Sequence, residues 1–167
     1  MKRVIREGVF ETNSSSTHSI AISKSDKYTI PKKVHFGIDE FGWEHATLST
    51  VGKRAAYLYT ALLCLDRFDA IPHFRKVLGA ANVKCTFERP IIHEYGEEKK
   101  WRCVKGAYVD HARELKDFLD YVLSCKDNLF RYLFSAESVI HTGNDNSEIR
   151  LPPCDKPEQF DYFYKGN

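Results

Sequence analysis

Apolar and polar residues alternate along the first part of the chain, which is the pattern of half-buried β-strands. The loosely alternating segment 2–11 predicts one strand, and segment 18–23 predicts its partner across the polar loop 12–17. Segment 28–36 predicts a further strand, in which Pro31 indicates an edge position or a break. We therefore expect an N-terminal β-hairpin followed by a strand at the edge of a sheet.

From Ser49 onward the spacing of apolar residues changes to the period of an α-helix. A first helix is predicted from one apolar stripe, which consists of Ala55, Leu58, Leu62 and Leu65. A second, shorter helix is predicted over 71–80. The clearest helical pattern starts at the capping residue Asp110 and continues through Leu115, Phe118, Leu119, Val122 and Leu123. A last short helix is predicted from Asp127 to Phe134.

Strand patterns return between the predicted helices and after the last one. Segment 83–88 alternates strictly, and segments 91–95 and 100–104 predict a hairpin. Segment 138–142 predicts another strand, which ends in a glycine- and asparagine-rich turn. The aromatic segment 160–164 is expected to pack back onto the body of the protein or onto a partner.

The mixture of strand and helix patterns predicts an α+β fold, with small antiparallel β-sheets packed against three to four helices. The length of 167 residues and the hydrophobic fraction of 43% suit one packed domain, 1–167. No apolar run approaches the roughly 18 residues that a membrane span needs. The basic start of the chain is not followed by the apolar region of a secretory signal. We therefore expect a cytoplasmic protein with no membrane partner.

Charge and cysteine content narrow the classes of partner. The net charge is only +2, so direct binding of nucleic acid is not favoured, and a specific protein partner fits at least as well. The five cysteines are an odd number, which argues against a disulfide framework and for reduced thiols that could bind a metal.

The polar segment 11–19 is the candidate functional surface. Hydroxyl, amide and backbone N–H groups in such a loop can hold a phosphate or a carboxylate. The residues that could bind a ligand or a partner there are Arg6, Glu11, Asn13, Ser14, Ser15, Ser16 and His18. His18 could also act as a base toward a serine, with Glu11 orienting it. Alternatively, the hydroxyl groups simply satisfy the backbone of their own loop.

The same segment carries a resemblance. Residues 6–19, Arg-Glu-Gly-Val-Phe-Glu-Thr-Asn-Ser-Ser-Ser-Thr-His-Ser, resemble the N-terminal signature of small, mostly uncharacterised proteins of bacteria and their phages. The resemblance implies a phage or prophage origin and a bacterial host cell. Small phage proteins often bind and block host defence machinery, as anti-CRISPR proteins do. The resemblance brings no catalytic residues with it.

A second candidate is a structural zinc site. Cys85 and Cys103 lie on segments that a hairpin could bring together, with His93 between them. A closed zinc site needs four thiolate or imidazole ligands, and the fourth could come from Cys125, His141 or Cys154. The spacing contains no Cys-x-x-Cys pair, and the alternative is that Cys85 and Cys103 pack inward as small apolar residues.

Two hypotheses of function follow. The first is a non-enzymatic, phage-type inhibitor that binds a protein, with a bacterial defence nuclease complex as the partner class, and with zinc as a stabilising ion. The second is a small enzyme or binding protein for a phosphorylated small molecule, with Arg6, Ser14, Ser15, Ser16 and His18 around the ligand. The sequence holds no nucleophile elbow, phosphate-binding loop or kinase pattern, so catalysis is not favoured.

Overall fold

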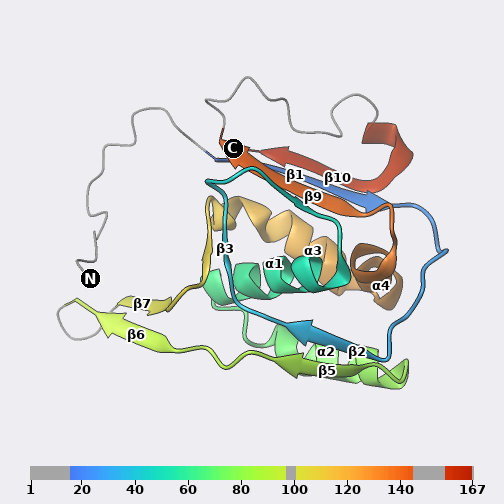
Figure 1. Cartoon of the computed structure of the whole chain (residues 1–167). Helices are drawn as coiled ribbons and strands as arrows, with labels where there is room; N and C mark the ends of the chain where they lie inside the picture. Colours follow the sequence, from blue (N-terminus) through green and yellow to red (C-terminus); the bar gives the residue numbers. More distant parts are fainter. Residues whose placement is uncertain (1–15, 97–100, 145–156, 167) are drawn as a thin grey trace.

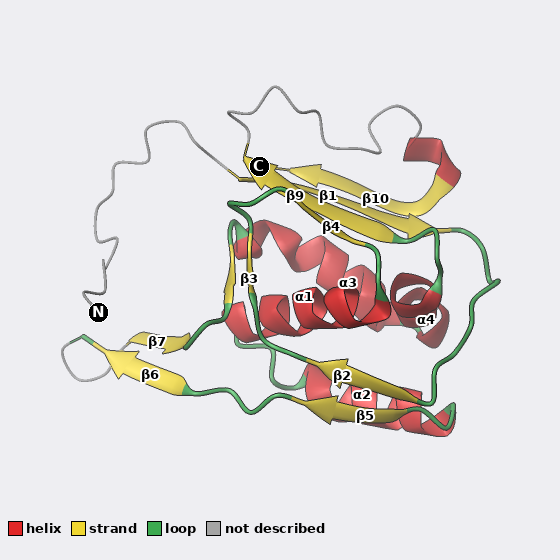
Figure 2. Ribbon diagram, viewed as in Figure 1, coloured by secondary structure: helices red, strands yellow, loops and turns green. Residues whose placement is uncertain are grey.

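A four-stranded antiparallel sheet forms one layer of the protein (Figures 1 and 2). The computed structural model describes residues 16–96, 101–144 and 157–166. In order across the sheet, the strands are β10 (Phe160–Gly166), β1 (Ser16–Ser23), β9 (Val139–Asn144) and β4 (Ala46–Leu48). The central strand β1 is buried along its whole length. Alternate side chains of β1, His18, Ile20 and Ile22, belong to one face because successive side chains of a strand point to opposite sides.

Helices cover one face of this sheet, which is the α+β architecture predicted from the sequence (Figure 2). The α-helices are α1 (Val51–Cys64), α2 (Ala70–Ala80), α3 (Lys116–Ser124) and α4 (Lys126–Phe134). Helix α1 lies centrally, and it begins where the Thr50 hydroxyl accepts a hydrogen bond from the Lys53 amide. Helices α3 and α4 pack against one another and, with α1, fill the space beneath the sheet.

Two short parallel strand pairs lie on other sides of α1. Strand β2 (Lys33–Phe36) pairs with β5 (Lys84–Phe87), and β3 (Glu40–Phe41) pairs with β8 (Tyr108–Val109). The β2–β5 pair lies on the side of α1 opposite the four-stranded sheet (Figure 1). There the Phe36 ring stacks on Phe74, with 5.5 Å between centroids, and on Phe87, with 4.7 Å. Aromatic stacking therefore joins β2, β5 and α2 into one core.

A two-stranded hairpin extends away from this body (Figure 1). Its strands are β6 (Ile92–Tyr95) and β7 (Trp101–Val104), which pair antiparallel as the sequence predicts. The amide of Lys105 donates to the carbonyl of Ile91 and extends the pairing by one step. Residues 91–96 and 101–104 are called the β6–β7 arm below.

Several predicted boundaries change. Of the predicted strand 28–36, only β2 forms a strand, and the residues before it have no regular secondary structure, although the carbonyl of Lys32 accepts a hydrogen bond from the amide of Lys84. The helix predicted to start at Asp110 is preceded by a 3₁₀ turn, η2 (Ala112–Leu115), and His111 takes a left-handed conformation with a φ of 52°. The predicted strand 2–11 and most of the loop 12–17 lie outside the described residues, and β1 already begins at Ser16.

The partners of β1 are the most distant strands of the sequence. It pairs with β9 on one side and with β10 on the other, so the aromatic C-terminal segment packs back onto the body as expected. A second 3₁₀ turn, η3 (Pro157–Gln159), leads into β10. Within the described ranges, no helix has both the length and the apolar character to cross a membrane.

Candidate functional site

The part of the polar segment that the structure describes is buried. The side chains of Ser16 and His18 are 0% and 1% exposed, at the start of β1. The Ser16 Oγ lies 3.3 Å from Nε2 of His18, and the Tyr57 hydroxyl on α1 lies 2.9 Å from Nδ1. Both ring nitrogens of His18 therefore have a hydroxyl group within hydrogen-bonding distance.

Asp110, directly after β8, joins the same cluster. Its carboxylate accepts hydrogen bonds from the Tyr108 hydroxyl, at 2.6 Å, and from the Ser16 hydroxyl. Burial by itself raises the pKa of Asp110, but these hydrogen bonds outweigh it and hold the pKa below the ordinary value. Asp110 is therefore an anion at neutral pH, and the Ser16 hydroxyl contacts both Asp110 and His18.

Glycine is required at position 42, directly after β3, where the backbone passes close to Ser16 and Asp110. Gly42 has a φ of +137°, and a Cβ atom there would lie 2.7 Å from Cβ of Asp110 and 3.2 Å from Oγ of Ser16. A side chain would collide with Asp110 and press tightly on Ser16, and the backbone angle itself favours glycine. The close approach of β3 is thus part of how Ser16 and Asp110 are held together.

Burial lowers the pKa of His18 to about 4, even though the nearby charge of Asp110 acts in the opposite direction. The imidazole is therefore neutral at physiological pH. A neutral ring donates through one nitrogen and accepts through the other, which matches two hydroxyl neighbours and a further hydrogen bond to the backbone of Asp110. The cluster satisfies its own polar groups inside the core, and the Ser16 hydroxyl offers a substrate no access.

The remaining residues of the predicted binding segment, Arg6, Glu11, Asn13, Ser14 and Ser15, lie outside the described residues. Only Ser16 and His18 are placed, and they face one another rather than an open pocket. The sequence contained the signal for this burial, because His18 occupies the same alternating face as Ile20 and Ile22.

The predicted zinc ligands are spread over two strand pairs. His93 and Cys103 are directly opposite one another in the β6–β7 arm. Cys85 instead belongs to β5, where it is paired with Val34 of β2 and packs beside the core. Among the residues that the structure describes, no three His, Cys, Asp or Glu side chains are grouped as a metal site requires. Of the fourth-ligand candidates, Cys154 lies outside the described residues. Zinc binding stays a prediction, which elemental analysis of the purified protein would test.

Sequence analysis did not identify the surface at the base of the β6–β7 arm. A cavity of about 500 Å³ lies there between the arm, the end of α1 and η2. Its apolar lining includes Leu63, Phe68, Ile92, Val104, Ala107 and Val109. The arm itself exposes three large apolar side chains, Ile91 at 58%, Ile92 at 48% and Tyr95 at 54%. We call this cavity the arm cleft.

A second cavity, of about 550 Å³, adjoins the start of β1. Gly42, which contacts Ser16, contributes to its wall, and so does Thr142, the β9 partner of His18. The charged and aromatic residues of its lining are Asp39, Glu40, Phe41, Trp43, Glu44, Lys53 and Tyr108. We call this cavity the acidic pocket. Tyr108 lines both cavities, so they are neighbours on the surface.

Two arginines organise the far side of the molecule. Arg54 on α1 is buried, and its guanidinium donates to four backbone carbonyl groups, those of Ser49, Leu133, Ser135 and Ser138. Arg131 on α4 instead lies near the surface and contacts the carboxylates of Asp26, at 2.7 Å, and Asp161, at 2.9 Å.

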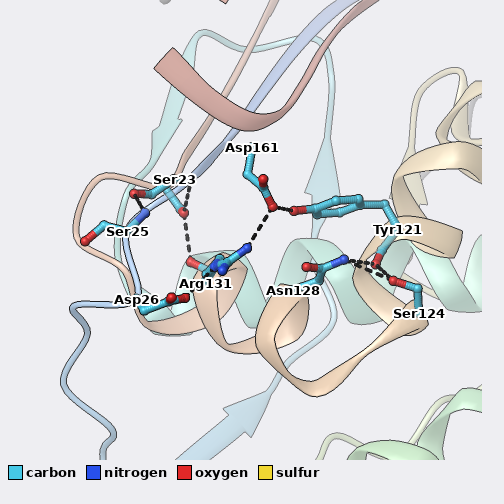
Figure 3. A network of polar contacts seen from close by, with 9 residues as sticks. Ser23, Ser25, Asp26, Tyr121, Ser124, Asn128, Arg131 and Asp161 are labelled. Atoms are coloured by element: carbon cyan, nitrogen blue, oxygen red, sulfur yellow. Dashed lines mark hydrogen bonds and ion pairs between the residues drawn. The ribbon is translucent and has the colours of Figure 1, made fainter. Parts of the chain in front are cut away.

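The Arg131 network joins four elements (Figure 3). Asp26 follows β1, Arg131 belongs to α4, Asp161 to β10, and Tyr121 of α3 donates its hydroxyl to Asp161. The two carboxylates raise the pKa of Arg131, chiefly through the hydrogen bond that Arg131 donates to Asp26. Arg131 is held by both carboxylates at once, and the Tyr121 hydroxyl donates to one of them, so the network acts as a structural connection between these elements.

Comparison of the chain with protein-family models, with curated protein sequences and with solved structures found no match. The site is therefore interpreted from its own chemistry.

Proposed function

We propose that this chain is a non-enzymatic protein-binding inhibitor or modulator that contacts its partner with the β6–β7 arm and the arm cleft. The observation that carries the proposal is the exposure of Ile91, Ile92 and Tyr95 on an extension of the fold. Several large apolar side chains exposed on one short extension mark an interaction site more often than isolated apolar residues do.

The geometry of the arm supports a protein rather than a small molecule as the partner. All four residues of β6 are exposed, so the strand contributes little to the core of its own domain. Ile92 borders the arm cleft, and Ile91 and Tyr95 fall on the other face of the strand because side chains alternate. The arm therefore offers an apolar side chain at a concave surface on one face and exposed tyrosine and isoleucine side chains on the other, and such residues are enriched in protein interfaces.

The class of partner rests on the resemblance of residues 6–19 to the signature of small bacterial and phage proteins. A bacterial defence nuclease complex is accordingly the first partner to test. Zinc, if bound, would serve stability rather than chemistry in this proposal.

The second hypothesis, a site for a phosphorylated small molecule, gains no support from the described residues. Ser16 and His18 are enclosed, and the cavity next to them is lined by Asp39, Glu40 and Glu44. These carboxylates repel a phosphate group, so this cavity suits a ligand of the opposite charge.

The proposal is tested by capture of defence nuclease complexes from lysate of a bacterial host with the tagged protein and two variants. Ile91→Thr/Tyr95→Thr removes apolar area from the arm while keeping residues that favour strands. Ile30→Thr is the matched control, because Ile30 is 42% exposed in the loop between β1 and β2, on the side of the molecule away from the arm.

We expect the wild-type protein and the control to capture the same complex and to inhibit its nuclease activity. The arm variant should bind at least about tenfold more weakly, as expected when hot-spot residues are truncated. Equal capture by the arm variant would overturn the assignment to the arm. Capture without any change in nuclease activity would overturn inhibition and leave protein binding.

A further inference from the structure

The acidic pocket has a composition that differs from that of the arm cleft. Three carboxylate residues, Asp39, Glu40 and Glu44, contribute to its lining, against a single ammonium group from Lys53. The carboxylates of Glu40 and Glu44 have no hydrogen-bond or ion-pair partner within the described part of the chain. Their charge is therefore not neutralised by those neighbours, and the pocket carries net negative charge.

Aromatic rings line the same pocket. Phe41, Trp43 and Tyr108 all contribute to its walls. The Tyr108 hydroxyl is fixed by its 2.6 Å hydrogen bond to Asp110, which is anchored in turn by Ser16, while 40% of the residue stays exposed. The ring is thus held in place by the buried cluster at the start of β1. Aromatic rings and carboxylates together recognise an organic cation, because each ring presents a negative face.

The backbone leaves room for such a group. Gly52 lines the pocket from the first turn of α1, and a Cβ atom there would meet nothing within 4 Å. Gly42 lines it from the position directly after β3. The volume of about 550 Å³ accommodates a long side chain, and the site lies beside the arm cleft because both share Tyr108.

We propose that the acidic pocket binds an arginine side chain of the protein partner. This inference rests on the proposed function, since it assigns a second contact to the same partner. Arginine suits the pocket better than lysine because the planar guanidinium stacks on aromatic rings and forms paired hydrogen bonds to carboxylates. A partner segment that places an apolar residue in the arm cleft then places the arginine beyond Tyr108.

The pocket is tested directly with N-acetyl-arginine amide, which carries the side chain in its peptide form. N-acetyl-citrulline amide has nearly the same shape without the charge and is the matched control ligand. Binding is followed by nuclear magnetic resonance at the Trp43 indole and at the Gly42 and Gly52 amides. A ligand of this size binds with a dissociation constant on the order of 1 mM.

Two matched variants distinguish the effect of the pocket carboxylates on binding from the effect of the overall net charge. Glu40→Gln/Glu44→Gln removes two carboxylates of the pocket, and Asp127→Asn/Glu158→Gln makes the same change in net charge at exposed sites outside it. We expect the arginine amide to shift the pocket resonances saturably in the wild type and in the control. In the pocket variant it should bind about tenfold more weakly, from the loss of two nearby charges. Equal binding of the citrulline amide, or unchanged binding by the pocket variant, would overturn the inference.

Partner capture distinguishes this inference from the proposed function. Glu40→Gln/Glu44→Gln should weaken capture of the complex and reduce its dependence on salt, whereas the arm variant should weaken capture without changing the affinity for the arginine amide. If only the arm variant affects capture, the partner's arginine is excluded and the proposed function stands. A further control replaces Arg3 and Arg6 of the chain by glutamine. If this substitution moves the pocket resonances and the added arginine amide does not, the chain's own N-terminal segment is the occupant, and a partner arginine is excluded.

Discussion

In most proteins polar side chains lie at the surface and large apolar side chains lie in the core. The start of β1 and the β6–β7 arm are opposite exceptions to this rule. At the start of β1, Ser16 and His18 are polar and fully enclosed, and their hydrogen-bonding groups are matched by Tyr57 and Asp110. On the arm, large apolar side chains are exposed to solvent. A buried polar group is tolerated when it is paired, and exposed apolar surface is tolerated when a partner covers it. The first region therefore serves the fold, and the second is available for binding.

This comparison makes the two regions separable by experiment. Substitutions in the buried polar positions should change the free energy of unfolding, and substitutions on the arm should change partner binding alone. The buried positions also include Arg54, whose four carbonyl acceptors link α1 to the end of α4 and to the residues before β9.

The largest effect is expected for Arg54→Met. The substitution keeps an unbranched side chain in place of the aliphatic part of arginine but removes the guanidinium that donates to the carbonyl groups of Ser49, Leu133, Ser135 and Ser138. We expect a loss of about 3–5 kcal/mol in the free energy of unfolding, measured by denaturant titration. Lys53→Met, at the exposed neighbouring position, should cost less than about 0.5 kcal/mol. A similar loss for both variants would show that the carbonyl cluster does not depend on Arg54.

A pH-dependent effect is expected from His18. Its folded pKa of about 4 lies below the ordinary histidine value of 6.5, so the unfolded chain takes up the proton first as the pH falls. Stability from this residue is therefore complete above pH 6.5 and is lost toward pH 4, by roughly 3 kcal/mol. His18→Gln should remove most of this slope, measured by denaturant titration across the range.

His45→Gln is the control for His18, because His45 is exposed. Burial also lowers the pKa of His141, which contributes a slope common to all three proteins. Asp110, with its pKa below the ordinary 3.8, loses its contribution only at lower pH. An unchanged slope in His18→Gln would contradict the burial of a neutral imidazole at the start of β1.

A smaller effect is expected for Arg131→Ala. The network in Figure 3 lies near the surface, and the Asp26 side chain is 69% exposed, so solvent and salt screen the ion pairs. We expect a loss of about 1 kcal/mol that shrinks as salt is added. Arg89→Ala, at an exposed position with no ion-pair partner within the described residues, should be near neutral. A loss for Arg131→Ala that is independent of salt would indicate packing rather than charge.

The smallest effect on stability is expected for Ile91→Thr/Tyr95→Thr in the arm. Both side chains are largely exposed, so the free energy of unfolding should change by less than about 0.5 kcal/mol. The same variant should lose most of its partner binding. A stability loss as large as that of His18→Gln would place these side chains in the folding core and remove the contrast between the two regions.

Local patterns predicted the elements but not their partners. The helical spacing around Leu58 and Leu119 and the alternation around Cys85 correspond to α1, α3 and β5. The pairing of β1 with β9 and β10 joins segments far apart in the chain, and no local pattern encodes such a contact. The parallel pairing of β2 with β5 was missed for the same reason.

The candidate site was predicted only in part. The burial of His18 and Arg54 was not predicted, although the sequence held a signal for it: His18 lies on an apolar strand face, and Arg54 precedes Leu58 by one helical turn on the apolar stripe. The partners Tyr57 and Asp110 come from other elements and depend on the tertiary fold. The acidic pocket is assembled from β3, β4, α1, β8 and β9, so its residues are dispersed in the sequence.

The central place of β1 in the sheet also has a consequence for the order of folding. Both strands that flank it lie in the last third of the sequence, from Val139 to Gly166. At a translation rate of about 5–20 residues per second, β1 waits roughly 7–29 seconds after its own synthesis until both neighbours are complete. Assembly of the sheet is therefore a late, non-local step, and the helices α1 to α4 have time to form before β1 is enclosed.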